Sequence, residues 1–144
     1  MVFAGLALAA VVLLMVGGGP RLTLAADSPA ADPLAGSEWR PVEIRGQAIG
    51  NGDKRFIRFG AEGKVTGNGG CNRIFGTAKF EGDGLTLAPL ASTRMACPEP
   101  VMKAEWAFID ALEAAHSFER DRARLVLRDA DGQTIMRLAQ TDWD

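Results

Sequence analysis

The sequence predicts a single α+β domain, rich in β-strands, in which one long helix packs on a curved antiparallel sheet. Short segments of alternating apolar and polar residues, separated by turn residues, fill most of the chain after residue 36. Residues 98–115 break this pattern with helical spacing, and a pair of strands follows them. A run of strands, one helix and a final hairpin together are typical of an α+β fold.

The first predicted strands lead to a glycine-rich corner at residues 67–72. Residues 37–44 form a strand in which Pro41 indicates either an edge position or a bulge, because proline cannot donate to a sheet ladder. Residues 55–59 form a short apolar strand. After a turn, residues 64–67 form the strand that enters the corner.

The strands after the corner form two predicted hairpins. Residues 73–80 and 85–89 are strands joined by a glycine-containing turn. Near the end of the chain, residues 124–128 place two leucines on one face and charged residues on the other. The Asp131–Gly132 pair is a strong turn signal, and residues 134–138 return antiparallel.

Residues 98–115 form the predicted helix. One face carries five residues at helical spacing: Val101, Glu105, Phe108, Leu112 and Ala115, with Met102, Trp106 and Ile109 beside them. Pro98 and Pro100 suit the first turn, and Glu99 interacts favourably with the helix dipole. We expect the helix to end near His116–Ser117 and its apolar face to cover the sheet.

An apolar amino terminus predicts export to the periplasm or the exterior. Its uncharged run of about fifteen residues suits a signal-peptide core and is short for a membrane span. We expect a cleaved signal peptide at 1–26, a linker at 27–35 and the folded domain at 36–140. Because no basic residue precedes the run and Arg21 follows it, an uncleaved anchor and a misplaced start site stay open.

The charge pattern argues against a nucleic-acid partner. Without residues 1–26 the chain has 15 basic and 18 acidic residues, a net charge of −3, and the two signs alternate along the sequence. Nucleic-acid binding requires a basic face. We expect contact with a membrane only through an uncleaved signal segment, and we expect a monomer.

Two cysteines, Cys71 and Cys97, are the only ones in the chain. Their separation fits neither a Cys-x-x-Cys redox motif nor a zinc site, which needs four ligands. In an oxidising compartment a disulfide across this loop would stabilise the fold by roughly 3–4 kcal/mol. A structural disulfide is the favoured interpretation, and two buried free thiols or a redox-active pair stay open.

The stretch 67–98 also carries a family resemblance. Its most specific parts are Gly-Cys-Asn at 70–72, Gly76 four residues later, and LASTRMACP at 90–98, ahead of the amphipathic helix. In this order they resemble the META domain, the HslJ-like heat-shock protein family of bacterial envelopes, over about residues 34–139. The resemblance implies a β-rich, partly open barrel of lipocalin-like topology with an inserted helix, a link to stress response, and no established reaction.

The titratable residues do not form the pattern of an active site. His116 is the only histidine, and we expect it to be solvated or to cap the helix end. Ser92 and Thr93 lack a nearby base. The glycines at 67–70 lack the Lys-Ser/Thr of a phosphate loop, so tight backbone geometry explains them better. We therefore expect a non-catalytic protein with no cofactor and no metal.

Two non-catalytic functions follow from these observations. The first is a stress-response module that binds another envelope protein through polar residues near the cysteines: Asn68, Asn72, Arg73, Thr93 and Arg94. An equal alternative is that the asparagines only satisfy turns. The second function is binding of a small apolar ligand in the barrel mouth. Against it, six aromatic side chains are expected to fill that space: Phe56, Phe59, Phe75, Phe80, Trp106 and Phe108.

Overall fold

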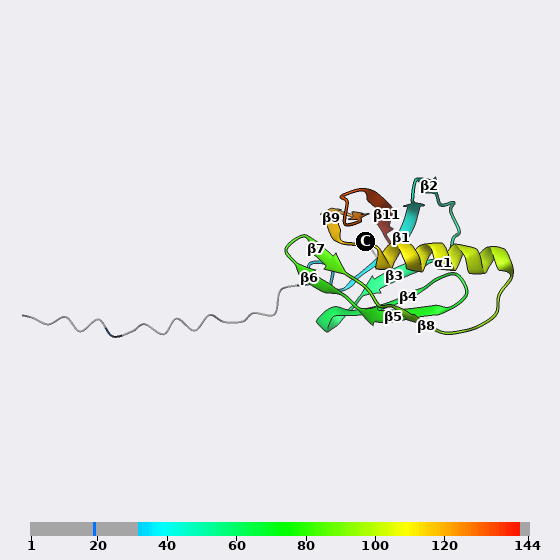
Figure 1. The fold of residues 1–144 in the computed structure, drawn as a ribbon, viewed down its shortest axis with the longest axis horizontal. Coiled ribbons are helices and arrows are strands. Elements are labelled where there is room, and N and C mark those ends of the chain that lie inside the picture. Colours follow the sequence, from blue (N-terminus) through cyan, green and yellow to red (C-terminus); the bar gives the residue numbers. More distant parts are fainter. Residues whose placement is uncertain (1–18, 20–31, 142–144) are drawn as a thin grey trace, which may run out of the picture.

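The computed structural model describes residue 19 and residues 32–141 (Figure 1). The predicted signal peptide at 1–26 and most of the predicted linker therefore lie outside the described residues. Within the described part of the chain, no helix has the length and apolar character needed to cross a membrane.

The described residues form one β-sheet and a single α-helix, α1 (Glu99–Glu113), together with a 3-10 turn, η1 (Ala61–Gly63). The strands are β1 (Ser37–Ile44), β2 (Gln47–Ala48), β3 (Phe56–Phe59), β4 (Lys64–Asn68), β5 (Arg73–Thr77), β6 (Lys79–Glu81), β7 (Gly84–Thr86), β8 (Ala91–Ser92), β9 (Ser117–Asp121), β10 (Arg124–Arg128) and β11 (Thr134–Gln140). This composition confirms the predicted β-rich α+β class.

The sheet is antiparallel throughout and curls into a half-barrel. Its order is β6-β7-β9-β10-β11-β1-β3-β4-β5-β8, with β2 paired to β1. Most strands pair with a neighbour in the sequence, as in an up-and-down barrel. The pairing of β1 with β11 joins the two ends of the domain, whereas β6 and β8 are free edges. The partly open barrel expected from the sequence is thus confirmed.

The helix packs on the inner face of this sheet, as predicted. Phe108, Ala111 and Leu112 of α1 are fully buried and belong to the same cluster as Trp39 and Met136 from β1 and β11. Figure 1 shows α1 lying across the strands, with the chain after β8 passing below it before turning into its first residue. This placement leaves α1 alongside the β8 edge of the sheet.

The fold begins earlier than expected. Leu34 lies in the predicted linker, yet it is fully buried in the core. Its N–H donates to Asp32 Oδ1 at 2.9 Å, and its carbonyl accepts from Ser37 N–H at 3.1 Å. The linker assignment is therefore wrong from residue 32 onward, because this local turn directs one apolar side chain inward.

One strand prediction is confirmed and one needs correction. The register of β1 shifts between Pro41 and Glu43, which confirms the bulge, one of the two alternatives predicted for Pro41, and β1 lies inside the sheet. The predicted strand 73–80 divides into β5 and β6, which pair with different neighbours. The division falls at Ala78, whose N–H donates to Gly63 O at 2.7 Å outside any ladder.

The aromatic residues fill the core only in part. Phe59 and Phe108 are buried, and Phe56 and Phe80 are half-buried. The prediction is wrong for Phe75, which is 47% exposed, and for Trp106, which is 72% exposed. Alternation along β5 turns Ile74 inward and Phe75 outward, and Trp106 lies beyond the part of α1 that faces the sheet.

The final hairpin is formed as predicted. Strands β10 and β11 pair in antiparallel register, with Leu125 and Leu127 buried. At the turn, Asp129 Oδ1 accepts from the N–H groups of Asp131 and Gln133, each at 3.0 Å.

Candidate functional site

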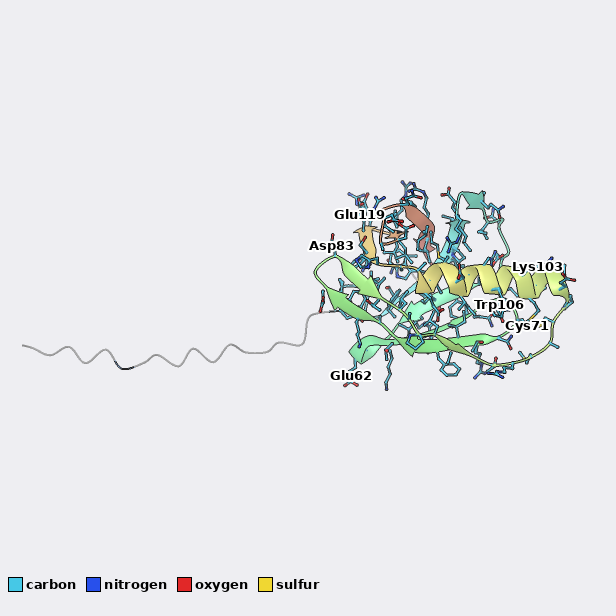
Figure 2. All side chains as sticks on the ribbon, viewed as in Figure 1. Glu62, Cys71, Asp83, Lys103, Trp106 and Glu119 are labelled. Carbon is cyan, nitrogen blue, oxygen red and sulfur yellow. A yellow bond between two sulfur atoms is a disulfide. The ribbon has the colours of Figure 1, made fainter. Side chains whose placement is uncertain are left out.

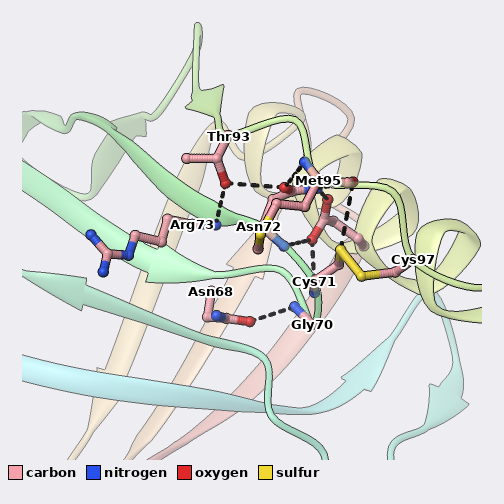
Figure 3. Close-up of a disulfide and its surroundings, with 9 residues drawn as sticks. Asn68, Gly70, Cys71, Asn72, Arg73, Thr93, Met95 and Cys97 are labelled. Atoms are coloured by element: carbon pink, nitrogen blue, oxygen red, sulfur yellow. Dashed lines mark hydrogen bonds between the residues drawn. A yellow bond between two sulfur atoms is a disulfide. The ribbon is translucent and has the colours of Figure 1, made fainter.

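A disulfide joins the glycine-rich corner to the entrance of α1. Cys71 lies between β4 and β5, Cys97 lies just before α1, and their Cα atoms are 6.2 Å apart (Figure 3). The described residues contain no free cysteine. The structural pairing favoured from the sequence is confirmed, and the interpretation of two buried free thiols is wrong.

A buried carboxylate fastens the same corner to the middle of α1. Glu105 is 3% exposed. Its Oε2 accepts from Cys71 N–H at 3.0 Å and from Asn72 N–H at 2.6 Å, while its Oε1 accepts from Asn72 Nδ2 at 2.7 Å. The backbone amides of the corner therefore bind an anion, and that anion is the carboxylate of Glu105 in the same chain.

The glycines of the corner make room for this carboxylate. A Cβ placed on Gly69 would lie 2.6 Å from Glu105 Oε2 and 2.8 Å from its Cδ. Gly70 has a φ of 113°, which L side chains rarely adopt. Backbone conformation thus explains Gly70, as the sequence indicated, whereas the close approach of the Glu105 side chain explains Gly69.

The hydrogen bonds determine the charge state of Glu105. Burial raises the pKa of this carboxyl group, but the hydrogen bonds from the Asn72 side chain and from the Asn72 and Cys71 amides outweigh burial and leave the pKa below the ordinary 4.5. The carboxylate is therefore ionised at neutral pH, as a strong acceptor must be.

Asn72 links the corner to the chain before α1. Its Oδ1 accepts from Met95 N–H at 2.6 Å and from the Thr93 hydroxyl at 3.0 Å, and its Nδ2 also donates to Met95 O at 3.3 Å (Figure 3). Both polar atoms of the amide are fully used. Asn72, Glu105 and the disulfide together hold residues 93–97 against the corner.

The predicted binding surface is only partly brought together. Asn72 is 2% exposed and cannot contact a partner. Asn68 Oδ1 accepts from Gly70 N–H at 2.7 Å, so Asn68 satisfies a turn, as the alternative interpretation held, whereas the Asn72 side chain bonds the distant residues Thr93, Met95 and Glu105. Arg73, Thr93 and Arg94 are exposed, and the Thr93 hydroxyl also accepts from Arg73 N–H at 3.1 Å.

The two arginines of that surface lie in different places. The Arg73 side chain points away from Asn72 in Figure 3 and lines a cleft on the outer face of the sheet with Asn68 and Phe75. Arg94 lines a groove between residues 90–96 and α1. Within the described residues neither side chain makes an ion pair.

The apolar wall of the groove beside α1 is the feature that sequence reasoning missed, whereas Asn72, Thr93 and Arg94 of the predicted surface line the same groove. The groove has a volume of about 600 Å³ and lies between the chain at 90–96 and one side of α1. Its apolar lining includes exposed Trp106, which Figure 2 labels on α1, and exposed Met95, with half-buried Met102 and Ile109. The available signal was a tryptophan at the margin of the helical stripe, which was assigned to the core.

A second buried ionic contact holds the first half of α1. The Arg55 side chain, 8% exposed, donates from Nε to Asp53 Oδ1 and from Nη2 to Asp53 Oδ2, each at 2.8 Å, and from Nη1 to Ala104 O at 3.1 Å. The hydrogen bond from Arg55 lowers the pKa of Asp53, against the effect of burial. This contact positions α1 relative to β3.

The residues considered for catalysis do not meet. His116 is exposed just after α1 and lines a cleft with Asp83 and Lys79, whereas Ser92 lines the groove beside α1. In the part of the chain that the structure describes, no three acidic, histidine or cysteine side chains are grouped so that they could hold a metal ion.

Comparisons with known proteins agree with this geometry. A model of the META domain matches residues 32–142. The fold is similar to that of a protein solved by NMR, with a TM-score of 0.58 and 24% identity over 74% of this chain and 90% of that one. It is also similar to an NMR structure from Burkholderia xenovorans, with a TM-score of 0.61 and 22% identity over 76% and 85% of the two chains.

A third similar structure is the crystal structure of a DUF4847 family protein from Bacteroides vulgatus. Its TM-score is 0.58, with 19% identity over 78% of this chain and 97% of that one. At these identities the three structures show the fold alone. No curated protein matches the sequence.

Proposed function

The chain belongs to the META domain family, and we propose that this member is a non-catalytic protein that binds another protein at the groove beside α1. We place it in the periplasm or outside the cell, as part of a response to envelope stress. The proposal assigns it no reaction, cofactor, metal or nucleic-acid partner.

The observation that carries the proposal is the exposure of Trp106. This side chain is 72% exposed, and Met95 across the groove is 56% exposed. Large apolar side chains gathered in a surface hollow are typical of interaction sites, and tryptophan is enriched among the residues that dominate binding energy. Neither residue is needed to complete the core.

Two features support an extracytoplasmic location. Disulfides persist mainly in oxidising compartments, and this one closes a loop at the centre of the domain. The apolar amino terminus, with small residues near position 25, has the pattern of an export signal. The link to envelope stress comes from the resemblance to heat-shock members of the family. Association with a membrane is expected only through an uncleaved signal segment.

A small apolar ligand is the second candidate function, and it fits the groove better than the barrel mouth. The inner face of the sheet is filled by a continuous cluster that includes Phe59, Phe108 and Leu112. The groove, in contrast, has a volume within the usual range for small-ligand sites, about 300–1,000 Å³.

Site-specific photocrosslinking distinguishes these functions. A photoreactive phenylalanine analogue in place of Trp106 should give one discrete protein adduct in exported material from heat-stressed cells. The same analogue in place of exposed Arg124, on the distant strand β10, should not. Loss of the adduct in an added Arg94→Glu variant would support the groove. Equal labelling from both positions, or none from Trp106, would overturn the proposal.

An Asn72 variant would test folding and not binding, because Asn72 is buried and makes hydrogen bonds through both side-chain polar atoms. Trp106→Ala and Arg94→Glu alter exposed side chains instead, so they should leave the domain folded.

A further inference from the structure

We propose that the groove binds its partner as an added β-strand: an extended peptide segment pairs with the free edge of β8 and inserts apolar side chains between β8 and α1. This inference rests on the proposed function and specifies the chemistry of the partner. The segment recognised has apolar residues at alternate positions and an acidic residue next to Arg94.

The backbone of β8 pairs with the sheet on one side only. It is the last strand of the sheet, next to β5, with Ser92 opposite Ile74. Thr93 N–H donates to Arg73 O at 3.1 Å. Because hydrogen-bonded and non-hydrogen-bonded pairs alternate in an antiparallel ladder, the N–H and C=O of Ser92 point away from β5.

The unpaired edge of this segment faces α1. Leu90, the residue before β8, donates its N–H to Glu113 Oε1 of α1 at 2.7 Å, as expected if the alternation of β8 extends to this residue. The outward edge of residues 90–94 therefore faces the helix across the groove. Within the described residues, the main chain of Arg94 also makes no hydrogen bond. Ser92 and Arg94 thus offer free donors and acceptors at strand spacing.

The wall of the groove opposite β8 is apolar and belongs to α1. Met102, Trp106 and Ile109 line the groove from consecutive turns of α1. An added strand lies about 4.8 Å from its neighbour and directs alternate side chains to each face. One set of peptide side chains would therefore contact this apolar wall. A groove between a strand edge and a helix is the geometry in which main-chain pairing provides affinity and side-chain pockets provide specificity.

The rim of the groove carries one arginine without an ionic partner in the described residues. Arg94 is exposed on its rim and makes no ion pair in the described part of the chain. Glu113 at the other end is already bonded to Leu90. An acidic side chain in the partner would therefore meet an unpaired guanidinium at Arg94. Because β8 itself has only two residues, a length that limits unwanted edge pairing, side-chain contacts must supply much of the affinity.

Fluorescent synthetic octapeptides test the inference on the protein purified after export. In each peptide valine or leucine alternates with threonine, and one threonine is replaced by aspartate in the first series and by lysine in the second. We expect aspartate peptides to bind in a polarisation assay at least tenfold more tightly than lysine peptides. Arg94→Glu should reverse that preference, while Arg124→Glu, a matched charge reversal far from the groove, should not change it.

Ser92→Pro isolates the pairing itself. It removes the outward N–H of Ser92 and leaves the Thr93 bond to β5 intact, an edge position at which proline is tolerated. We expect an unchanged melting temperature and at least tenfold weaker peptide binding. If the variant does not fold, N-methylation of alternate peptide amides provides the same test on the unaltered protein, with one set of positions abolishing binding and the other having no effect.

The outcomes separate the two proposals. Unchanged binding in Ser92→Pro, with binding lost in Trp106→Ala, would overturn strand addition and leave the groove as a protein site. Absence of binding by every peptide would also overturn strand addition. A dimer that Ser92→Pro dissociates would assign the edge to a second copy of the chain and refute the peptide partner. Peptide binding unaffected by Trp106→Ala would count against the proposed function itself.

Discussion

Replacing Glu105 tests the central contact of the domain. Alanine at this position would remove the acceptor for three donors, the Cys71 and Asn72 amides and the Asn72 side chain. Glutamine would keep one oxygen but direct an NH₂ group at either the amides or Asn72 Nδ2. The Asn72 amide cannot turn over to compensate, because its Oδ1 already accepts from Thr93 and Met95.

The magnitude follows from burial. Leaving a buried donor unsatisfied costs about 1–3 kcal/mol, and hydrogen bonds to charged groups are at the upper end of the usual range. We expect Glu105→Ala to lower the free energy of unfolding by about 3–5 kcal/mol and Glu105→Gln by about 1–3 kcal/mol. A domain of this size has only about 5–15 kcal/mol in total, so the alanine variant should be marginal at 37 °C.

The difference in the free energy of unfolding between wild type and Glu105→Gln should also depend on pH. The folded-state pKa of Glu105 lies below its ordinary 4.5. The contribution of the ionised carboxylate to the free energy of unfolding is therefore complete well above pH 4.5. It is lost as the pH falls through the folded-state pKa, because the carboxylate is then protonated in the folded protein as well as in the unfolded chain. The difference in the free energy of unfolding between wild type and Glu105→Gln should be widest near neutral pH and should shrink as the pH falls below 4.5.

Urea denaturation followed by tryptophan fluorescence, with the disulfide intact, measures all three proteins. Glu99→Gln is the matched control, because Glu99 forms an exposed i,i+4 pair with Lys103 on the same helix. It should cost no more than about 0.5 kcal/mol. Two results would refute the reasoning. One is a loss of less than about 1 kcal/mol in the free energy of unfolding of Glu105→Ala, and the other is a difference between wild type and Glu105→Gln that grows as the pH is lowered.

Three further predictions concern the supports of the site. Gly69→Ala should destabilise the domain by about 1–3 kcal/mol in urea denaturation, because the new methyl group would displace the Glu105 carboxylate. Replacing both Cys71 and Cys97 by serine should cost about 3–4 kcal/mol, seen as a lower melting temperature that reductant does not change further. Asp53→Asn should cost about 1–3 kcal/mol, because it weakens the partner of the buried Arg55 guanidinium.

Each of these has a matched control. Gly50→Ala places a methyl group where nothing lies within 4 Å and should be neutral or slightly stabilising. The unmutated protein in reductant should approach the stability of the double serine variant. Asp110→Asn removes the partner of Arg45 in an exposed ion pair and should cost less than Asp53→Asn. Equal effects in a variant and its control would contradict the assigned contact.

The sequence was sufficient for the elements with a clear period. The alternation of Leu125 and Leu127 and the turn at Asp131–Gly132 led to the final hairpin. The helical stripe from Val101 to Ala115 located α1 to within two residues at each end. These local patterns are readable because burial of one face imposes a period on the chain.

Contacts between distant segments were not readable in the same way. Glu105 fell on the apolar face of the predicted helix, where a carboxylate needs buried donors, but no local pattern identifies the amides of Cys71 and Asn72 as those donors. Trp106 lies one residue further along, and only the path of residues 90–96 beside α1 leaves it exposed. The site is therefore a product of tertiary arrangement.

The chain from Leu90 to Cys97 is fastened at both ends. Glu113 holds Leu90 at one end, while Asn72 and the disulfide hold Met95 and Cys97 at the other. The intervening residues have little conformational freedom left to lose when a partner arrives. Ordering the backbone of a loop residue costs roughly 1–2 kcal/mol in entropy. Residues 90–97 are already ordered when the domain folds, so binding does not require this free energy again. Reducing the disulfide should therefore weaken the proposed peptide binding, because residues 90–97 would become more flexible and would have to be ordered again when the peptide binds.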